Sequence, residues 1–127
     1  MSKKKRLLLV EDEIDLIKLY KKILTEAGYD LTICNDGVSA YKAIKNDVFD
    51  LYLIDIVMPS LDGVALLKKI NEEKNESIAK KTIILFTNFD NETAFETAKK
   101  YGATDVLIKV NFNPEELLQK IKKYLDT

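Results

Sequence analysis

Short apolar runs alternate along the chain with stretches in which apolar residues recur every three to four positions. The runs predict buried strands at residues 7–10, 31–34, 51–54, 82–86 and 106–108. The recurring positions between them predict amphipathic helices. Strands that are apolar on both faces belong to parallel sheets covered by helices on both sides. The pattern therefore predicts an α/β fold around a parallel sheet of five strands.

The helices are expected from their apolar stripes and from the residues at their ends. The stripes are Ile14, Ile17, Tyr20, Leu24 and Ala27; Ala40, Tyr41 and Ile44; Val64, Leu67 and Ile70; Ala94, Phe95, Ala98 and Tyr101; and Leu117, Leu118, Ile121 and Leu125. Gly28 and Gly102 are expected to end the first and fourth helices. Asn113 and Glu116 around Pro114 predict a capped start for the fifth. Residues 72–81 are expected to form a loop or a frayed helix end.

Length and composition predict one domain over residues 1–127. With 46% hydrophobic residues, the chain has enough apolar surface for one core. No apolar run is long enough to cross a membrane. A net charge of -1 provides no strong attraction to nucleic acid, so no direct nucleic-acid binding is expected. The single cysteine, Cys34, forms no internal disulfide and suits a reducing cytoplasm.

The chain contains no histidine. This excludes a Ser-His-Asp or Cys-His catalytic pair, histidine-ligated zinc and a phosphohistidine carried by this chain. Any chemistry here must use carboxylates, hydroxyls, lysines and bound ions.

Charged or hydroxyl residues stand directly after four of the five apolar runs: Glu11 and Asp12, Asp55, Thr87, and Lys109. Taken singly, each has an ordinary structural explanation, such as a helix cap or a solvated charge. In a doubly wound sheet, however, the carboxyl ends of the strands form the functional crevice. Two carboxylates about 4 Å apart repel by roughly 4 kcal/mol at an effective dielectric near 20. A hard divalent cation such as Mg²⁺ would relieve that repulsion, and the lysine and threonine would then suit a phosphoryl group.

In these motifs the chain resembles a two-component response regulator receiver domain over essentially its whole length. The matching segments are "VEDE" after the first run, "DIVMPSLDG" after the third, "LFTN" after the fourth and "GATDVLIK" at the fifth. The resemblance implies a flavodoxin-like doubly wound sheet with strand order 2-1-3-4-5 and five helices.

The resemblance also implies a role for each strand-end residue. Asp55 would be the phosphoacceptor, and Lys109 and Thr87 would contact the phosphoryl oxygens. Mg²⁺ would be held by Asp12, by Asp55 and by the backbone carbonyl of Val57. Glu11 would support the ion, directly or through water. Met58-Pro59 would shape the loop after Asp55, and Asp62-Gly63 would set the turn into the next helix.

The partners implied are a sensor histidine kinase or phosphotransfer protein that donates the phosphoryl group, and a downstream protein target or output domain. A receiver is not an enzyme in the usual sense, since it catalyses only its own phosphorylation and dephosphorylation. The chain ends at Thr127, and both a stand-alone receiver and a piece of a longer regulator fit that end.

Three positions depart from the family pattern. Val106 stands where many receivers have Tyr or Phe, so the usual movement of an aromatic ring cannot occur. Asn88 replaces a small residue after Thr87, and is expected either to narrow the entrance or to be merely exposed. Val110 replaces a proline that is often cis, and a trans peptide is expected here. Signalling is therefore predicted to run through repacking of the loop after residue 87 and of the helix that follows.

Two other functions remain open from the sequence. A receiver fold can act as a protein-interaction scaffold that is never phosphorylated, and the departures at Val106 and Asn88 fit that alternative. A phosphatase of the haloacid-dehalogenase type also uses an aspartyl phosphate. That family has a second Asp two residues after the nucleophile, where this chain has Val57.

Overall fold

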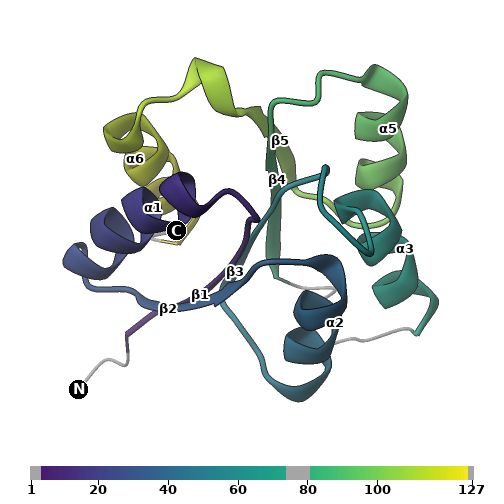
Figure 1. Ribbon diagram of the computed structural model, residues 1–127, viewed down its shortest axis with the longest axis horizontal. Helices are drawn as coiled ribbons and strands as arrows, with labels where there is room; N and C mark the ends of the chain where they lie inside the picture. The colour runs from purple at the N-terminus through teal and green to yellow at the C-terminus, as the bar shows by residue number, and fades with distance from the viewer. Residues whose placement is uncertain (1–3, 74–80, 126–127) are drawn as a thin grey trace.

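The computed structural model describes residues 4–73 and 81–125, which form one parallel sheet between two helical layers (Figure 1). The strands are β1 (Arg6–Val10), β2 (Asp30–Cys34), β3 (Leu51–Ile54), β4 (Thr82–Thr87) and β5 (Asp105–Ile108). All neighbouring pairs are parallel, and their order is β2-β1-β3-β4-β5. The predicted α/β class and the flavodoxin-like strand order are both confirmed.

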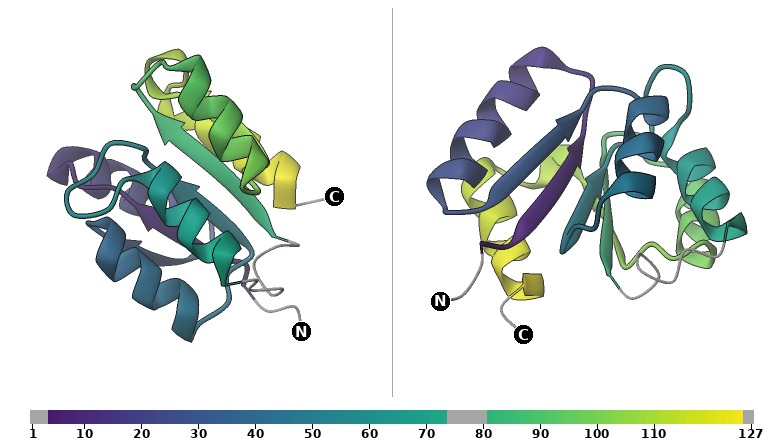
Figure 2. Two further views of the ribbon diagram at one scale, coloured as in Figure 1. Left: turned by 90° about the vertical axis from the view of Figure 1, so that its right-hand side faces the viewer. Right: turned by 90° about the horizontal axis from the view of Figure 1, so that it is seen from below.

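Within the described residues, five α-helices and one short 3-10 helix connect the strands. They are α1 (Ile14–Glu26), α2 (Gly37–Asn46), α3 (Gly63–Glu72), α5 (Glu92–Lys100), η1 (Lys109–Asn111) and α6 (Pro114–Leu125). Helices α1 and α6 cover one face of the sheet, and α2, α3 and α5 cover the other (Figures 1 and 2).

The strands are apolar throughout because each one supplies side chains to both helical layers. In β1, Leu8 and Val10 belong to the core under α2, α3 and α5, whereas Leu7 and Leu9 belong to the core under α1 and α6. All four are at most 2% exposed. This alternation follows from the two-residue period of a strand, and it explains the continuous hydrophobic runs in the sequence.

The predicted stripe of the first helix is wrong at its first position. Ile14 is 67% exposed, although Tyr20 and Leu24 are buried as expected. Leu16 and Ile23 pack against the core of that face instead. Ile14 is the first residue of α1, where the helix has just left the sheet. A side chain there has the helical spacing but no neighbouring layer to cover it.

The predicted helix ends agree with the structure. Gly28 has a φ of 96°, and the backbone N–H groups of Gly28 and Tyr29 close the end of α1 by donating to Thr25 and Leu24. At the start of α6, Asn113 accepts from the N–H of Glu116 at 2.8 Å. The Glu116 side chain in turn accepts from the N–H of Asn113 at 3.0 Å, which is the expected capping box.

Two further sequence predictions concern residues 72–81 and membrane-spanning helices. The loop or frayed end expected at residues 72–81 lies mostly outside the described residues, and α3 extends to Glu72. Among the residues that are described, no helix has the length and apolar character needed to span a bilayer.

Candidate functional site

The predicted strand-end residues meet at one rim of the sheet. Asp55 directly follows β3, Thr87 is the last residue of β4, and Lys109 directly follows β5 as the first residue of η1. A cavity of about 360 Å³ opens there. It is lined by Asp12, Glu13, Asp55, Val57, Thr87, Asn88, Phe89 and Lys109.

Asp55 is held in place by the backbone on both sides of it. Its N–H donates to the carbonyl of Val10 at 3.1 Å, which continues the pairing of β1 with β3 beyond Ile54. Its Oδ1 accepts from the N–H of Val57 at 3.2 Å. The side chain is 8% exposed. A carboxylate on a rigid strand end can therefore be aimed at the cavity with little freedom to move.

The turn after Asp55 needs glycine at position 63 for a steric reason. A Cβ atom on Gly63 would lie 2.4 Å from the carbonyl oxygen of Asp55. The Gly63 N–H donates to Ile56 at 2.9 Å, and the Asp62 side chain caps α3 by accepting from Ala65 at 2.8 Å. The predicted role of Asp62 and Gly63 in starting this helix is thereby confirmed.

Lys109 joins the two buried carboxylates of the site. Its Nζ donates to Asp55 Oδ2 at 2.8 Å and also to Glu11 Oε1. The lysine side chain is 7% exposed. Burial lowers the pKa of Lys109, but the hydrogen bonds and charges of Asp55 and Glu11 raise it more, and the net shift is upward. The site therefore contains a fixed cation directly beside Asp55.

Glu11 differs from the other acids because it is buried and fully engaged. It is 1% exposed. Its Oε2 accepts from the N–H groups of Asp12 at 3.0 Å and Glu13 at 3.2 Å, and its Oε1 accepts from Lys109. Burial raises the pKa of the Glu11 carboxyl, while Lys109 and the Glu13 N–H act in the lowering direction. The ammonium in contact with Oε1 stabilises the charged form, so Glu11 anchors both the lysine and the loop that carries Asp12.

The three acids are close enough to share one cation. One oxygen from each of Glu11, Asp12 and Asp55 lies within 4.8 Å of the other two. An all-oxygen donor set of this size suits a hard divalent ion such as Mg²⁺. Asp12 is exposed at the cavity, whereas the oxygens of Glu11 already accept other hydrogen bonds. The residues present thus fit such an ion, with Asp12 and Asp55 better placed than Glu11 to contact it.

Thr87 lies at the end of β4, which β3 separates from β1 and the loop of Asp12. It is 1% exposed, and its Oγ1 accepts from the N–H of Phe89 at 3.1 Å. A hydroxyl that accepts one hydrogen bond still has its own hydrogen to donate. Phe89 itself was not predicted at the site, because an aromatic residue in a loop carries no recognisable chemical pattern.

The structure resolves the position of Asn88 and the peptide before Val110. Asn88 is exposed and lines the acidic cavity, and its side chain accepts from the N–H of Val110 at 3.0 Å. Within the described residues there is no cis peptide, and the expected trans bond between Lys109 and Val110 is confirmed. Val106 is half-buried against the core under α2, α3 and α5.

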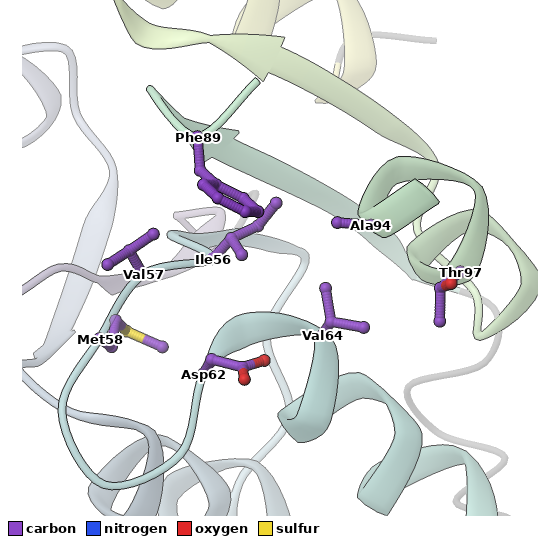
Figure 3. Close-up of a pocket in the computed structure, with 8 residues that line it drawn as sticks. All are labelled: Ile56, Val57, Met58, Asp62, Val64, Phe89, Ala94 and Thr97. Atoms are coloured by element: carbon purple, nitrogen blue, oxygen red, sulfur yellow. The ribbon is translucent and has the colours of Figure 1, made fainter. Parts of the chain in front are cut away.

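An apolar pocket of about 390 Å³ adjoins the acidic cavity and shares Val57 and Phe89 with it (Figure 3). It is lined by Ile56, Val57, Met58, Asp62, Val64, Phe89, Ala94 and Thr97. The Phe89 ring lies beside Ile56 over this pocket (Figure 3). The loop after β4 therefore contacts both the charged cavity and an apolar space that reaches α3 and α5.

Comparisons with known proteins agree with this arrangement. Over residues 7–122 the sequence matches the family described as the response regulator receiver domain. The alkaline phosphatase synthesis transcriptional regulatory protein PhoP of Bacillus subtilis is 30% identical over 121 residues, or 95% of this chain and 48% of PhoP. The chain thus spans about half the length of this curated relative.

Solved structures share the whole fold. A CheY-like response regulator receiver domain from Methanospirillum hungatei superposes with a TM-score of 0.86 at 30% identity, covering 98% of this chain and 95% of the other. The receiver domain of sensor histidine kinase PA1611 from Pseudomonas aeruginosa gives 0.84 at 26% identity, covering 98% of this chain and all of the other (100%). That structure has a magnesium ion coordinated in its active site cleft.

Proposed function

We propose, since the chain belongs to the family of response regulator receiver domains, that it is a phosphorylation-dependent switch of a two-component system. Asp55 accepts a phosphoryl group from a sensor histidine kinase or a phosphotransfer protein. The phosphorylated form then changes its contacts with a downstream protein or an output domain. The protein works in the cytoplasm and catalyses only its own phosphorylation and dephosphorylation.

In the proposed reaction, a carboxylate oxygen of Asp55 attacks the phosphorus of a phosphohistidine on the partner. A P–O bond forms and the P–N bond breaks, with its electron pair going to the ring nitrogen, which a proton from solvent then neutralises. Lys109, already 2.8 Å from Asp55 Oδ2, neutralises charge on the phosphoryl oxygens. Thr87 donates its hydroxyl hydrogen to one of them.

Asp12, Asp55 and the Val57 backbone carbonyl would hold Mg²⁺, with Glu11 supporting the site from behind. The ion supplies charge neutralisation for the phosphoryl oxygens when it is bound. The chain's own contribution is to keep these acids crowded together, so that a divalent cation is favoured between them.

Phosphorylation adds about -1.5 to -2 charge at the rim. The response must then involve an element with two arrangements of similar energy. The loop after β4 fits that role, because Thr87 faces the acidic cavity and Phe89 faces the apolar pocket beside α5. Such a signal needs no aromatic residue at Val106.

The observation that carries this proposal is the buried contact of Lys109 with Asp55, across 54 residues of sequence. Stability alone does not explain a lysine that is buried with two acids beside a cavity, because a buried ion pair contributes little net free energy to folding. It is well placed, however, to neutralise a group that arrives on Asp55. The intact set of acids, lysine and threonine also argues against a scaffold that is never phosphorylated.

The test is incubation of the protein with acetyl phosphate and Mg²⁺, followed by intact mass measurement. We expect a gain of one phosphoryl group in the natural protein, no gain in Asp55→Asn and no gain when Mg²⁺ is chelated. An equal gain in Asp55→Asn would place the modification elsewhere. No gain in the natural protein, together with retained binding to a partner, would support the scaffold instead.

A further inference from the structure

The β4–β5 ladder ends beside the candidate site, at the backbone pair that directly precedes Asn88 and Lys109. The last register pair is Thr87 with Ile108. Beyond it the two chains enter different loops, one through Asn88 towards α5 and the other through Lys109 into η1. Thr87 and Lys109 therefore stand where the regular backbone pairing stops, and something other than the sheet must set the distance between the two loops.

The Asn88 side chain continues the connection across this gap. Its Oδ1 accepts from the N–H of Val110 at 3.0 Å. The bond joins the residue that follows Thr87 to the residue that follows Lys109, so it connects the two loops one residue beyond each functional side chain.

The N–H of Val110 is a donor that η1 itself does not satisfy. The first N–H groups of a helix have no partner within the helix, and Val110 is the second residue of η1. The hydrogen bond within this turn runs from Phe112 to the carbonyl of Lys109 at 3.1 Å. Asn88 thus caps the turn that carries Lys109 from a different part of the chain. A proline at position 110 would have no N–H to offer, so Asn88 and Val110 act as a matched pair.

From this geometry we infer that Asn88 is a positioning residue for Lys109. Its hydrogen bond to Val110 fixes the start of η1, and thereby holds the Lys109 ammonium against Asp55 and Glu11 while a phosphoryl group is transferred. The inference rests on the proposed function for its consequence in catalysis, but the positioning of Lys109 exists without phosphorylation. Asn88 is therefore assigned a positioning role and not a catalytic one.

The variant Asn88→Ala removes the acceptor, and Asn88→Asp keeps an oxygen acceptor at the same position. Asn111→Ala truncates an exposed asparagine of η1 and serves as the matched control. In Asn88→Ala we expect faster hydrogen exchange at the Val110 amide and a shifted NMR signal of the Lys109 ammonium. Asn111→Ala is expected to keep both signals close to those of the natural protein, and Asn88→Asp is expected to keep the slow exchange at the Val110 amide.

The phosphorylation rate of Asn88→Ala at saturating acetyl phosphate, measured by intact mass, should fall by about five- to tenfold. A change of this size is expected if the loss of one hydrogen bond weakens the stabilisation of the transition state by Lys109. The donor concentration at half-saturation and the Mg²⁺ affinity should stay within about twofold, because neither binding group is altered. Asn111→Ala should keep the rate of the natural protein. A general loss of folding would instead lower the rate and weaken the binding of both donor and Mg²⁺.

An unchanged Lys109 ammonium signal in Asn88→Ala would overturn the inference, as would a wild-type rate of phosphorylation in that variant. If the natural protein takes up no phosphoryl group, the proposed function fails instead. The Val110 exchange and the Lys109 signal then still decide whether Asn88 positions the lysine.

Discussion

The two ends of the same sheet each gather charges, but they do so in opposite environments. At the carboxyl end, Lys109 lies between Glu11 and Asp55, and all three side chains are at most 8% exposed. At the amino end, Arg6 lies between Asp47 and Asp30, and these side chains are 36% to 58% exposed. The types of charge are the same in both clusters, whereas the access of water differs.

The exposed cluster is also held by short hydrogen bonds. Arg6 contacts Asp47 through two nitrogens, at 2.5 and 2.6 Å, and its guanidinium lies 5.0 Å from the centre of the Phe49 ring. Exposed pairs nevertheless contribute little stability, because water screens them and their side chains lose freedom. The amino-end cluster therefore fastens the start of β1 to the segment before β3.

The buried cluster is costly to form, and its members depend on one another. Removing a single partner leaves an uncompensated charge away from water. The comparison distinguishes the two clusters by their burial: the candidate site holds charges that are buried beside a cavity, whereas the charges at the amino end are exposed to water.

The largest effect is expected for Lys109→Met. The two acids would lose their shared cation, and the free energy of unfolding should fall by about 3–5 kcal/mol. Mg²⁺ should restore part of the loss, since a cation between the acids stabilises the folded state. Phosphorylation by acetyl phosphate should slow by about 100-fold or more. Denaturant titrations with and without Mg²⁺, and intact mass over time, measure these changes.

Lys81→Met is the control for that experiment at the amino end. Lys81 lies 4.0 Å from Asp50, and both side chains are about one-third exposed (33% and 32%). We expect a change of at most about 0.5 kcal/mol and no effect of Mg²⁺ on it. Equal losses in the two lysine variants would contradict the distinction between the two ends.

Gly63→Ala should be the next most harmful change. The new Cβ would be forced against the Asp55 carbonyl oxygen, at 2.4 Å, so the backbone under Asp55 must shift. We expect a loss of about 1–3 kcal/mol in unfolding free energy together with slower phosphorylation. Gly28→Ala is a matched control, because Gly28 has open space but a φ of 96°. That variant should lose stability while its phosphorylation rate stays unchanged.

Asp47→Asn tests the exposed cluster by pH. The hydrogen bonds with Arg6 lower the pKa of Asp47 from 3.8 to about 2. A carboxyl with a depressed folded pKa stabilises the fold above its unfolded pKa, and this contribution is lost as the pH falls from 3.8 towards 2. The melting temperature of the variant should therefore fall less than that of the natural protein as the pH is lowered from 3.8 towards 2, as thermal unfolding curves would measure. Its phosphorylation at neutral pH should equal that of the natural protein.

The smallest effect is expected for Ile14→Ser, beside the buried cluster. Ile14 is 67% exposed, so its removal should change the unfolding free energy by no more than about 0.5 kcal/mol. Leu24→Ala, in the same helix but 1% exposed, should cost about 2–5 kcal/mol. Similar losses at both positions in chemical denaturation would show that Ile14 is covered in solution.

The fold was predictable from the sequence because its signals are local. A strand that is apolar on both faces, a glycine after a helix and a capping box are each contained in fewer than about 15 residues. The residues that meet at the rim were predictable for a related reason, since parallel strands bring their carboxyl ends to one edge. The strand order itself came from the resemblance, because periodicity says nothing about which strands are neighbours.

The elements, their layering and the strand-end residues Asp55, Thr87 and Lys109 could thus be read from the order of residues. The contacts of Lys109 with Glu11 and Asp55, across 98 and 54 residues, could not, and neither could the hydrogen bond between Asn88 and Val110 across 22 residues. Ile14 likewise has the helical spacing of a core residue, but its side chain is exposed because no other part of the described fold covers it. The physical reason is the same in each case: a side chain's partners are set by how elements pack in space, whereas sequence patterns record only how one element is built.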